Sequence, residues 1–281
     1  MTNEALDNKS QNPVWQHAQE EELKCWIGMK KKLETHAYLK IKSQYWLDFL
    51  EKLGITAEDL RNQSVLEIGN GPSGLFLLAK ENKQFFLCDP LNAKYKENFP
   101  WLFGCNVMIS SRAEDLNLGQ KFQSIFAINS IDHCDDINEF LVAVSKHLDP
   151  NGKFYLGVNT HNYKLIQLIW ERFQAYIEPH HPYQMTTGQY GELFSRYFYV
   201  KEIIDMEDLV IAVNQKTDLK SLGLSERRRT TNFREKIFDR EIFGKILVRA
   251  LKRLGYPQHD FHRQGKSLFR NKLFVLSPKV D

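Results

Sequence analysis

The stretch of sequence that decides the fold reads Val65-Leu66-Glu67-Ile68-Gly69-Asn70-Gly71-Pro72-Ser73-Gly74, with the spacing E-x-G-x-G-x-x-G. The residues Ser64–Ile68, which begin one residue before this stretch, are expected to form a strand. Gly69 and Gly71 permit a tight turn after that strand and let a ligand lie directly against the backbone. Dinucleotide-binding proteins share this glycine spacing, so the turn alone indicates a ligand site without naming the ligand.

The residues around this turn narrow the kind of ligand. Gly74 lets a helix, expected near Ser73–Glu81, pack closely on the sheet and face the ligand with its amide-rich N-terminus. Glu67 stands two residues before the first glycine, where its carboxylate can meet a cationic amine directly or through water. Asp89 ends a second expected strand, Gln84–Cys88, where an acid can accept both hydroxyls of a ribose. Together the two acids favour these roles over the alternative that each only caps a strand end.

Strand and helix patterns alternate downstream of the turn. Such alternation implies βαβ units and a parallel sheet, with the ligand outside the carboxyl ends of the strands. The further expected elements are strands at Asn106–Ile109, Phe122–Ile128 and Lys153–Val158, a helix at Ile137–Leu148 and a sixth strand at Tyr197–Asp205.

With these elements in place, residues 64–160 resemble the Rossmann-like S-adenosylmethionine-dependent methyltransferases, in their broad small-molecule branch. The resemblance implies an α/β fold with a doubly wound, mostly parallel seven-stranded sheet and helices on both faces. Three further segments carry it: 111–116 (SRAEDL), like the loop that contacts adenine; 126–133 (FAINSIDH), like the segment beside the sulfonium; and 147–156 (HLDPNGKFYL), like the turn before the fifth strand.

The same resemblance implies S-adenosylmethionine as the cofactor and assigns roles to residues. Gly69, Gly71 and Gly74 would surround the methionine part. Arg112 and Asn151 depart from the family, which often has an acid at the first position and usually a glycine at the second. The other implied contacts are Glu67 and Asn129 near the amino group and sulfonium, Asp89 on the ribose, and Ala113 with Glu114 on the adenine.

Methyl transfer needs mainly alignment of the two reactants, and a general base is required only if the acceptor is a hydroxyl. Histidine suits that task near neutral pH. Three candidates stand at the expected strand ends or in the following loop: His133, His161 and His181. We expect His161 to be the base ahead of the others. The position of His133 recurs in family members with different acceptors, so a packing role competes there.

Carboxylates after the fourth strand raise the alternative of a magnesium site. Asp132, Asp135 and Asp136 cluster there, and carboxylate oxygens bind magnesium. Asp136 directly precedes the helix expected from Ile137, which is the position of an N-cap. We favour the cap and predict no metal site.

The chain is expected to fall into four parts: an N-terminal helical lid (1–60), the cofactor-binding core (61–207), a basic helical insertion (208–268) and the last strand (269–281). Helices are expected at Trp15–Lys32 and Ala37–Leu53. Trp26, Tyr45 and Trp46 are candidate lid aromatics, although core packing is preferred for Trp46. The seventh strand is expected at Asn271–Ser277, with Leu209–Val213 as the alternative.

Charge is divided unevenly along the chain. Residues 220–281 carry 16 Lys and Arg against 6 Asp and Glu, whereas residues 1–219 carry 22 against 29. The segment Phe233–Leu254 has an apolar helical face, and Arg227-Arg228-Arg229 precedes it. Arginine binds phosphate well. We therefore expect a small, anionic or phosphorylated acceptor and O-methylation ahead of N-methylation; the alternative is a helix whose charges only keep it solvated.

Other features bound the location and the rival functions. No signal peptide and no membrane-spanning run is recognised, and the four scattered cysteines suit reduced thiols in the cytoplasm. An oligomer is possible on these grounds, and a nucleic-acid partner is not expected. The rivals are a nicotinamide-dependent oxidoreductase, a non-catalytic cofactor-binding module and an RNA or protein methyltransferase.

Overall fold

A seven-stranded sheet forms the centre of the protein in the computed structural model, which describes residues 12–161, 167–168, 171–172, 183–216 and 269–279. The strand order is β3-β2-β1-β4-β5-β7-β6. All neighbours are parallel except β7, which is antiparallel to β5 and β6. This confirms the predicted doubly wound, mostly parallel sheet. The strands are β1 (Val65–Ile68), β2 (Phe85–Cys88), β3 (Val107–Ile109), β4 (Phe122–Ile128), β5 (Leu148–His161), β6 (Phe198–Asp205) and β7 (Phe269–Pro278).

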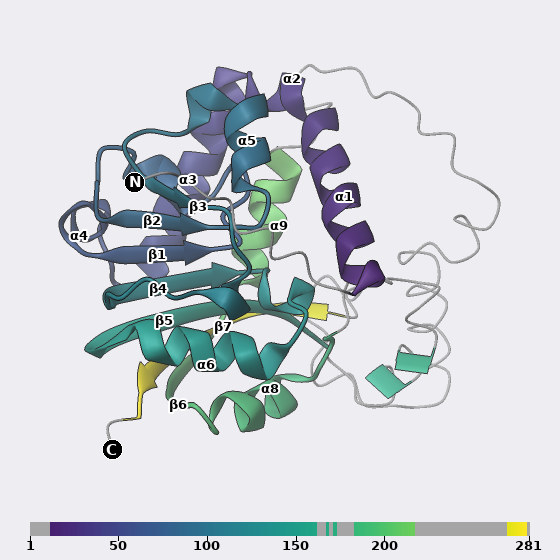
Figure 1. Ribbon diagram of the computed structural model, residues 1–281, viewed down its shortest axis with the longest axis vertical. Helices are drawn as coiled ribbons and strands as arrows, with labels where there is room; N and C mark the ends of the chain where they lie inside the picture. Colours follow the sequence, from purple (N-terminus) through teal and green to yellow (C-terminus); the bar gives the residue numbers. More distant parts are fainter. Residues whose placement is uncertain (1–11, 162–166, 169–170, 173–182, 217–268, 280–281) are drawn as a thin grey trace.

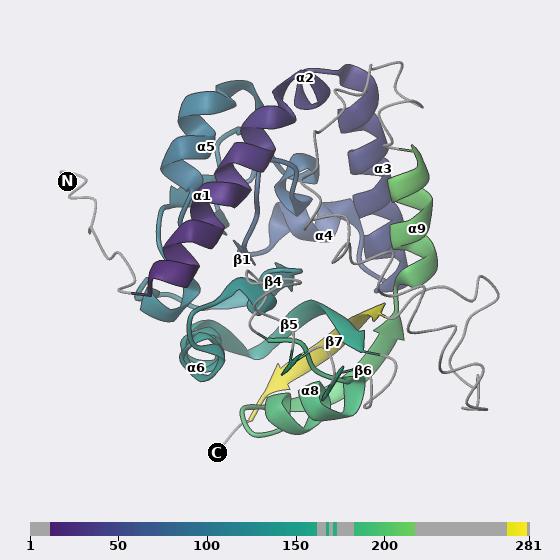
Figure 2. The ribbon, with the colours of Figure 1, turned by 90° about the vertical axis from the view of Figure 1, so that its right-hand side faces the viewer.

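The strand order reverses between β1 and β4, which creates the switch point where ligands bind in such sheets. The carboxyl ends of β1, β2 and β4 therefore lie at one edge of the sheet (Figure 1). Helix α1 (Pro13–Gly28) lies on that side, and Figure 2 shows it crossing in front of the strand ends. The glycine-rich turn after β1 thus faces the N-terminal helix.

Helices cover both faces of the sheet (Figure 2). On one face, apolar side chains of β1, β4 and β5 pack against α6 (Ile137–His147) and α8 (Thr187–Phe194). On the other face, α3 (His36–Lys52), α4 (Ala57–Asn62) and α9 (Glu207–Lys216) complete a second core. Each strand contributes side chains to both cores because successive residues point to opposite faces.

The N-terminal helices form a third, smaller core with the segment that follows β2. Helix α2 (Lys30–Leu33) and α5 (Asn92–Asn98) bring Leu33 and Tyr95 together with Tyr38 of α3. The helix expected at Trp15–Lys32 is divided, because α1 ends at Gly28 and Met29 separates it from α2. The helix expected at Ala37–Leu53 is confirmed as α3.

Two sequence-based expectations are wrong. The helix expected at Ser73–Glu81 is only the 3-10 turn η1 (Leu75–Leu78). It ends there because the backbone of Ala79 has a non-helical conformation. The alternative seventh strand at Leu209–Val213 lies inside α9, where residues at helical spacing pack on α3. The other 3-10 turns are η2 (Pro100–Leu102), η3 (Ala113–Asp115) and η4 (Ile131–His133).

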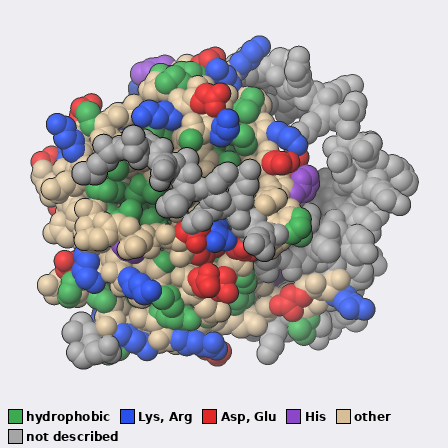
Figure 3. All heavy atoms as spheres, viewed as in Figure 1, with side chains coloured by type: hydrophobic (Ala, Val, Ile, Leu, Met, Phe, Trp, Pro, Cys, Tyr) green, Lys and Arg blue, Asp and Glu red, His purple; other side chains and the backbone are tan. Residues whose placement is uncertain are grey.

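Several predicted features lie outside the described residues. They are His181, the run Arg227-Arg228-Arg229, the segment Phe233–Leu254 and most of the 208–268 insertion. On the face drawn in Figure 3, the coloured Lys and Arg side chains are interspersed with Asp and Glu. No helix in the described part of the chain has both the length and the apolar character needed to cross a membrane.

Candidate functional site

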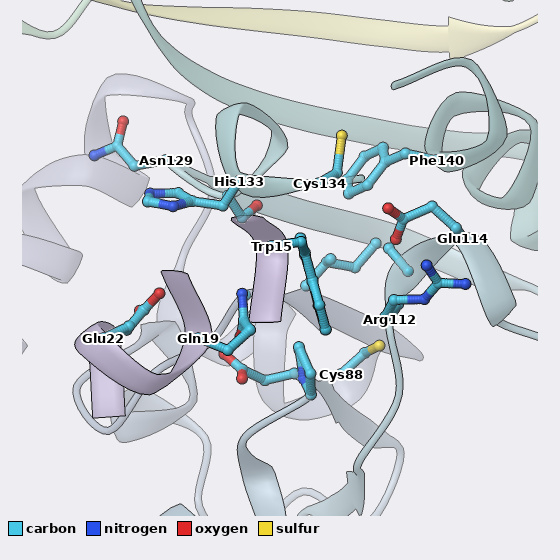
Figure 4. Close-up of a pocket in the computed structure, with 16 residues that line it drawn as sticks. Trp15, Gln19, Glu22, Cys88, Arg112, Glu114, Asn129, His133, Cys134 and Phe140 are labelled. Atoms are coloured by element: carbon cyan, nitrogen blue, oxygen red, sulfur yellow. The ribbon is translucent and has the colours of Figure 1, made fainter. Parts of the chain in front are cut away.

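A cleft lies at the carboxyl ends of β1, β2 and β4 (Figure 4). Its floor comes from the strand ends and the loops after β3 and β4, and its roof comes from α1. It has the position expected for a small-molecule site in this architecture. The lining residues are Trp15, Gln19, Glu22, Ile68, Gly69, Cys88, Asp89, Pro90, Arg112, Ala113, Glu114, Asn129, Ser130, His133, Cys134 and Phe140.

Gly69 and Asn129 bring the ends of β1 and β4 into close contact. Gly69 has φ +67°, and a Cβ at this position would collide with the Cβ of Ser130. Asn129 has φ +53°, a left-handed conformation that Asn tolerates better than most residues. The Ser130 hydroxyl is buried and has no hydrogen-bond partner within the described residues. The floor at this point is therefore bare backbone beside an unsatisfied hydroxyl.

Asp89 connects the end of β2 to the glycine-rich turn. Its Oδ1 accepts a hydrogen bond from the Leu91 amide (2.8 Å) and its Oδ2 accepts one from the Gly71 amide (3.3 Å). Burial, followed by the nearby charge of Glu22, raises the pKa of Asp89 to about 7. Each carboxylate oxygen can accept more than one hydrogen bond, so Asp89 keeps the capacity to bind donors in the cleft.

Glu67 lies behind the turn, and the cleft-lining residues do not include it. Its carboxylate accepts hydrogen bonds from the amides of Leu75 (2.6 Å) and Phe76 (3.0 Å). Burial raises the pKa of Glu67 to about 8. The prediction that the amides of η1 face a ligand is therefore wrong, because Glu67 occupies them. Gly74 is required there, since a Cβ would collide with the Glu67 carboxylate.

Gly71, like Glu67 and Gly74, supports the turn from outside the cleft lining. Its φ is +48°, and a Cβ on it would lie 3.2 Å from the Trp26 ring of α1. Trp46 of α3 also holds the turn, because its buried Nε1 donates to the Ser73 carbonyl at 2.9 Å. The preference for core packing of Trp46 is confirmed, since its exposed fraction is 6%.

The loops after β3 and β4 are tied together beside Ala113 and Glu114, which both line the cleft. The Glu114 carboxylate accepts hydrogen bonds from the backbone amides of Asp135 (2.7 Å) and Asp136 (3.3 Å). Arg112 makes a two-pronged ion pair with Asp115 and a third contact with Asp135 at 3.1 Å. The departure from the family at Arg112 thus joins two loops of the site.

Three residues of the roof were not predicted. Trp15, Gln19 and Glu22 line the cleft from α1, at the spacing of one helical face. In Figure 4 Trp15 points from α1 into the cleft, and its ring lies 5.9 Å from the Arg112 guanidinium. Glu22 accepts a hydrogen bond from Trp26 Nε1 at 3.3 Å. Their helical spacing was the signal that could have identified them as one face. It was not recognised, because the three side chains differ in polarity.

The structure places the candidate bases differently with respect to the cleft. His133, from η4, lines the cleft. His161, at the end of β5, is 2% exposed, lies 4.4 Å from the Phe269 ring and is not among the lining residues.

Asp136 accepts hydrogen bonds from the Asn138 and Glu139 amides, which confirms it as the N-cap of α6. No group of three or more potential metal ligands gathers in the described residues.

No protein-family model matches the chain, and no curated protein matches it in sequence. Solved structures do. The YcgJ protein from Bacillus subtilis has 14% identity and a TM-score of 0.52, over 84% of this chain and 100% of that one. A coclaurine N-methyltransferase bound to N-methylheliamine and S-adenosylhomocysteine has 15% identity and a TM-score of 0.51, over 82% and 69%.

An O-methyltransferase from a trans-AT PKS multienzyme of Brevibacillus brevis, in complex with S-adenosylhomocysteine, has 12% identity and a TM-score of 0.50, over 97% of this chain and 81% of that one. At these identities the likeness concerns the fold. The chain has the fold of the S-adenosylmethionine-dependent methyltransferases, which is the fold that the sequence predicts.

Proposed function

We propose that the protein is an S-adenosylmethionine-dependent methyltransferase that acts on a small-molecule acceptor. The observation that carries the proposal is the Asp89 carboxylate, buried at the end of β2 and facing a cleft whose floor is the bare backbone of Gly69. A ribose offers two hydroxyl donors to such a carboxylate. The fold of the structural neighbours supports this reading without assigning the activity.

The residues of the cleft fit this cofactor. Asp89 would accept the ribose hydroxyls, and Ala113 with Glu114 would flank the adenine. Gly69 and Asn129 would lie along the methionine part, and the Ser130 hydroxyl would gain a partner there. Glu67, Gly71 and Gly74 would act indirectly, by shaping the turn. The bound cofactor supplies a methyl group on a positively charged sulfur.

The protein then has to orient the acceptor and, for a hydroxyl acceptor, to remove one proton. His133 lines the cleft and replaces His161 as the first candidate for this base. His161 stays a second candidate, and His181 lies outside the described residues. O-methylation is part of the proposal because a base is present on the cleft wall.

The acceptor class rests on the sequence. An anionic or phosphorylated small molecule suits the basic segment 220–281, with an RNA or protein methyltransferase and a non-catalytic cofactor-binding module as the alternatives. The four-part division, with residues 1–60 as a lid and 208–268 as an insertion, also belongs to the proposal. So does a cytoplasmic location, which the four free cysteines suit.

The first test is direct binding. Titration calorimetry should show binding of S-adenosylmethionine and S-adenosylhomocysteine and no binding of NADH. Tight binding of NADH, or no binding of either adenosyl ligand, contradicts the proposal. Release of S-adenosylhomocysteine with a panel of phosphorylated and neutral hydroxyl compounds then separates an enzyme from a binding module.

The base is tested once an acceptor is found. His133→Ala should lower turnover about 10²- to 10⁴-fold while the affinity for S-adenosylhomocysteine stays unchanged. His161→Ala is the comparison variant, since His161 ends β5, which is parallel to β4, but only His133 lines the cleft. If only His161→Ala lowers turnover, the assignment of His133 is wrong and the earlier preference for His161 returns.

A further inference from the structure

One face of α3 is directed at the glycine-rich turn. Tyr38, Lys42 and Trp46 are spaced by four residues, so they lie on the same side of the helix. Trp46 donates a hydrogen bond to the Ser73 carbonyl, and the Tyr38 hydroxyl lies near the Ser73 side chain. Lys42 stands between two side chains that both reach this turn. Its position is therefore fixed by contacts on either side of it along the helix.

The Lys42 ammonium is held by aromatic rings. Its Nζ lies 4.8 Å from the centroid of the Tyr45 ring and 5.4 Å from that of Trp46. Within the described residues, Lys42 forms no ion pair with a carboxylate. Aromatic rings attract an ammonium without neutralising it. Lys42 thus offers a positive charge beside the turn that no carboxylate in contact with it cancels.

The electrostatic surroundings of Lys42 agree with this description. Burial and the like charge of Lys32 lower the pKa of Lys42 to about 8, and Glu67 opposes that shift. The Glu67 carboxylate is itself engaged by the amides of Leu75 and Phe76. A partly buried cation with a lowered pKa gains most from an added anion, because the anion replaces the hydration that burial removed.

We propose that Lys42 binds the carboxylate of the amino-acid end of the cofactor. The inference rests on the proposed function and deepens it. The adenosine end of the cofactor is assigned to Asp89, Ala113 and Glu114, so its amino-acid end lies toward Gly69 and the turn. A carboxylate there needs a cation or free amides, and Glu67 already occupies the amides of η1. Lys42 is the cation that acts on Glu67 at this turn.

A purely structural role is the competing explanation, in which Lys42 only stabilises the turn beside Glu67. The two roles differ in their ligand dependence. S-adenosylhomocysteine carries the amino-acid carboxylate, whereas 5′-methylthioadenosine has the same adenosine and thioether without it. A carboxylate-binding lysine matters for the first ligand alone, whereas a lysine that only shapes the turn matters equally for both.

The test compares the wild type with Lys42→Met in titrations of both ligands at pH 7. We expect the affinity for S-adenosylhomocysteine to fall about 10- to 100-fold, the range for a hydrogen bond to a charged group, with 5′-methylthioadenosine changed less than about twofold. Lys40→Met is the matched control: it removes the same charge from the same helix, but at an exposed position that borders a different groove. It should leave both affinities unchanged.

A second measurement detects the proton that Lys42 takes up when the ligand binds. At pH 8.5, above the pKa of Lys42, wild-type binding of S-adenosylhomocysteine should take up protons, measured from the binding enthalpy in two buffers of different ionisation heat. Lys42→Met should lose that uptake. Equal losses for both ligands, or an unchanged affinity for S-adenosylhomocysteine, overturn the role of Lys42. If the wild type binds neither ligand, the proposed function itself fails.

Discussion

The floor and the roof of the cleft are built in different ways. The floor residues Gly69, Asp89 and Asn129 stand at strand ends, where the backbone conformation or the close approach of two loops restricts the residue type. The roof residues Trp15 and Glu22 stand on a helix, where any side chain of suitable reach fits the backbone. The floor should therefore tolerate substitution poorly, and the roof should tolerate it well.

The largest effect is expected at Gly69. Gly69→Ala should weaken S-adenosylhomocysteine binding by at least about 100-fold, because the new Cβ collides with Ser130 and displaces the loop after β4. Gly119→Ala is the control, since Gly119 has φ +63° with no atom within 4 Å of its Cβ position. Both variants should lose about 1–2 kcal/mol of stability in urea denaturation from the positive φ. Equal binding by the two variants would show that the close approach is unimportant.

Asp89 should have the next largest effect. Asp89→Ala should weaken binding of both S-adenosylhomocysteine and 5′-methylthioadenosine by about 1.5–3 kcal/mol, because both ligands carry the ribose. Asp149→Ala is the control: Asp149 also accepts the amide two residues ahead at 2.8 Å, as Asp89 does, but it lies at the opposite ends of the strands. Calorimetry of the two variants with each of the two ligands tests the ribose assignment. A loss of affinity for only one ligand would contradict it.

The pH dependence of binding tests the same carboxylate. The pKa of Asp89 is raised to about 7 by burial and by Glu22, with the amides of Gly71 and Leu91 opposing the shift. Binding of 5′-methylthioadenosine should therefore weaken by about tenfold per unit below pH 7, where Asp89 becomes protonated. The raised pKa also means that Asp89 stabilises the ligand-free fold at low pH, and this contribution is lost as the pH rises through 7. Asp89→Ala should lack the binding dependence; a persistent slope would implicate another group.

The roof at Trp15 should give the smallest effect. Trp15→Phe should weaken S-adenosylhomocysteine binding less than about fivefold, because a smaller ring keeps part of the aromatic contact. It should also reduce the ligand-induced change in tryptophan fluorescence. Trp101→Phe is the control, since Trp101 likewise lies near a cation (Lys30, 5.5 Å) but away from the cleft. A loss at Trp15 as large as that at Asp89 would remove the distinction between floor and roof.

The sequence predicted the sheet well because each strand has its own local signals. Phe122–Ile128 is bounded by turns and matches β4, and Asn271–Ser277 lies within β7. The absence of a full helix after β1 could not be predicted, because the turn is shaped by the carboxylate of Glu67 in β1, which accepts hydrogen bonds from its amides. Glu67 was recognised as special, but its partners, the amides of Leu75 and Phe76, depend on the folded turn.

The candidate site divides in the same way. The glycine spacing, the strand ends and the family resemblance together led to Gly69, Asp89, Ala113, Glu114, Asn129 and His133, all of which the structure places in the cleft. Trp15, Glu22 and Lys42 were not singled out, since nothing in a helical pattern says which ligand a polar position will face. Their significance comes from the tertiary packing of α1 over the strand ends and of α3 against η1.

The place of β7 has a consequence for how the chain is made. β7 lies between β5 and β6, although 63 residues separate Asp205, the last residue of β6, from Phe269, the first of β7. During synthesis β6 therefore has no neighbour to pair with until β7 has left the ribosome. Such long-range closure is slow, and β5 keeps an open edge in the meantime. A nascent chain stalled before Phe269 should bind chaperones, and one released after Pro278 should not.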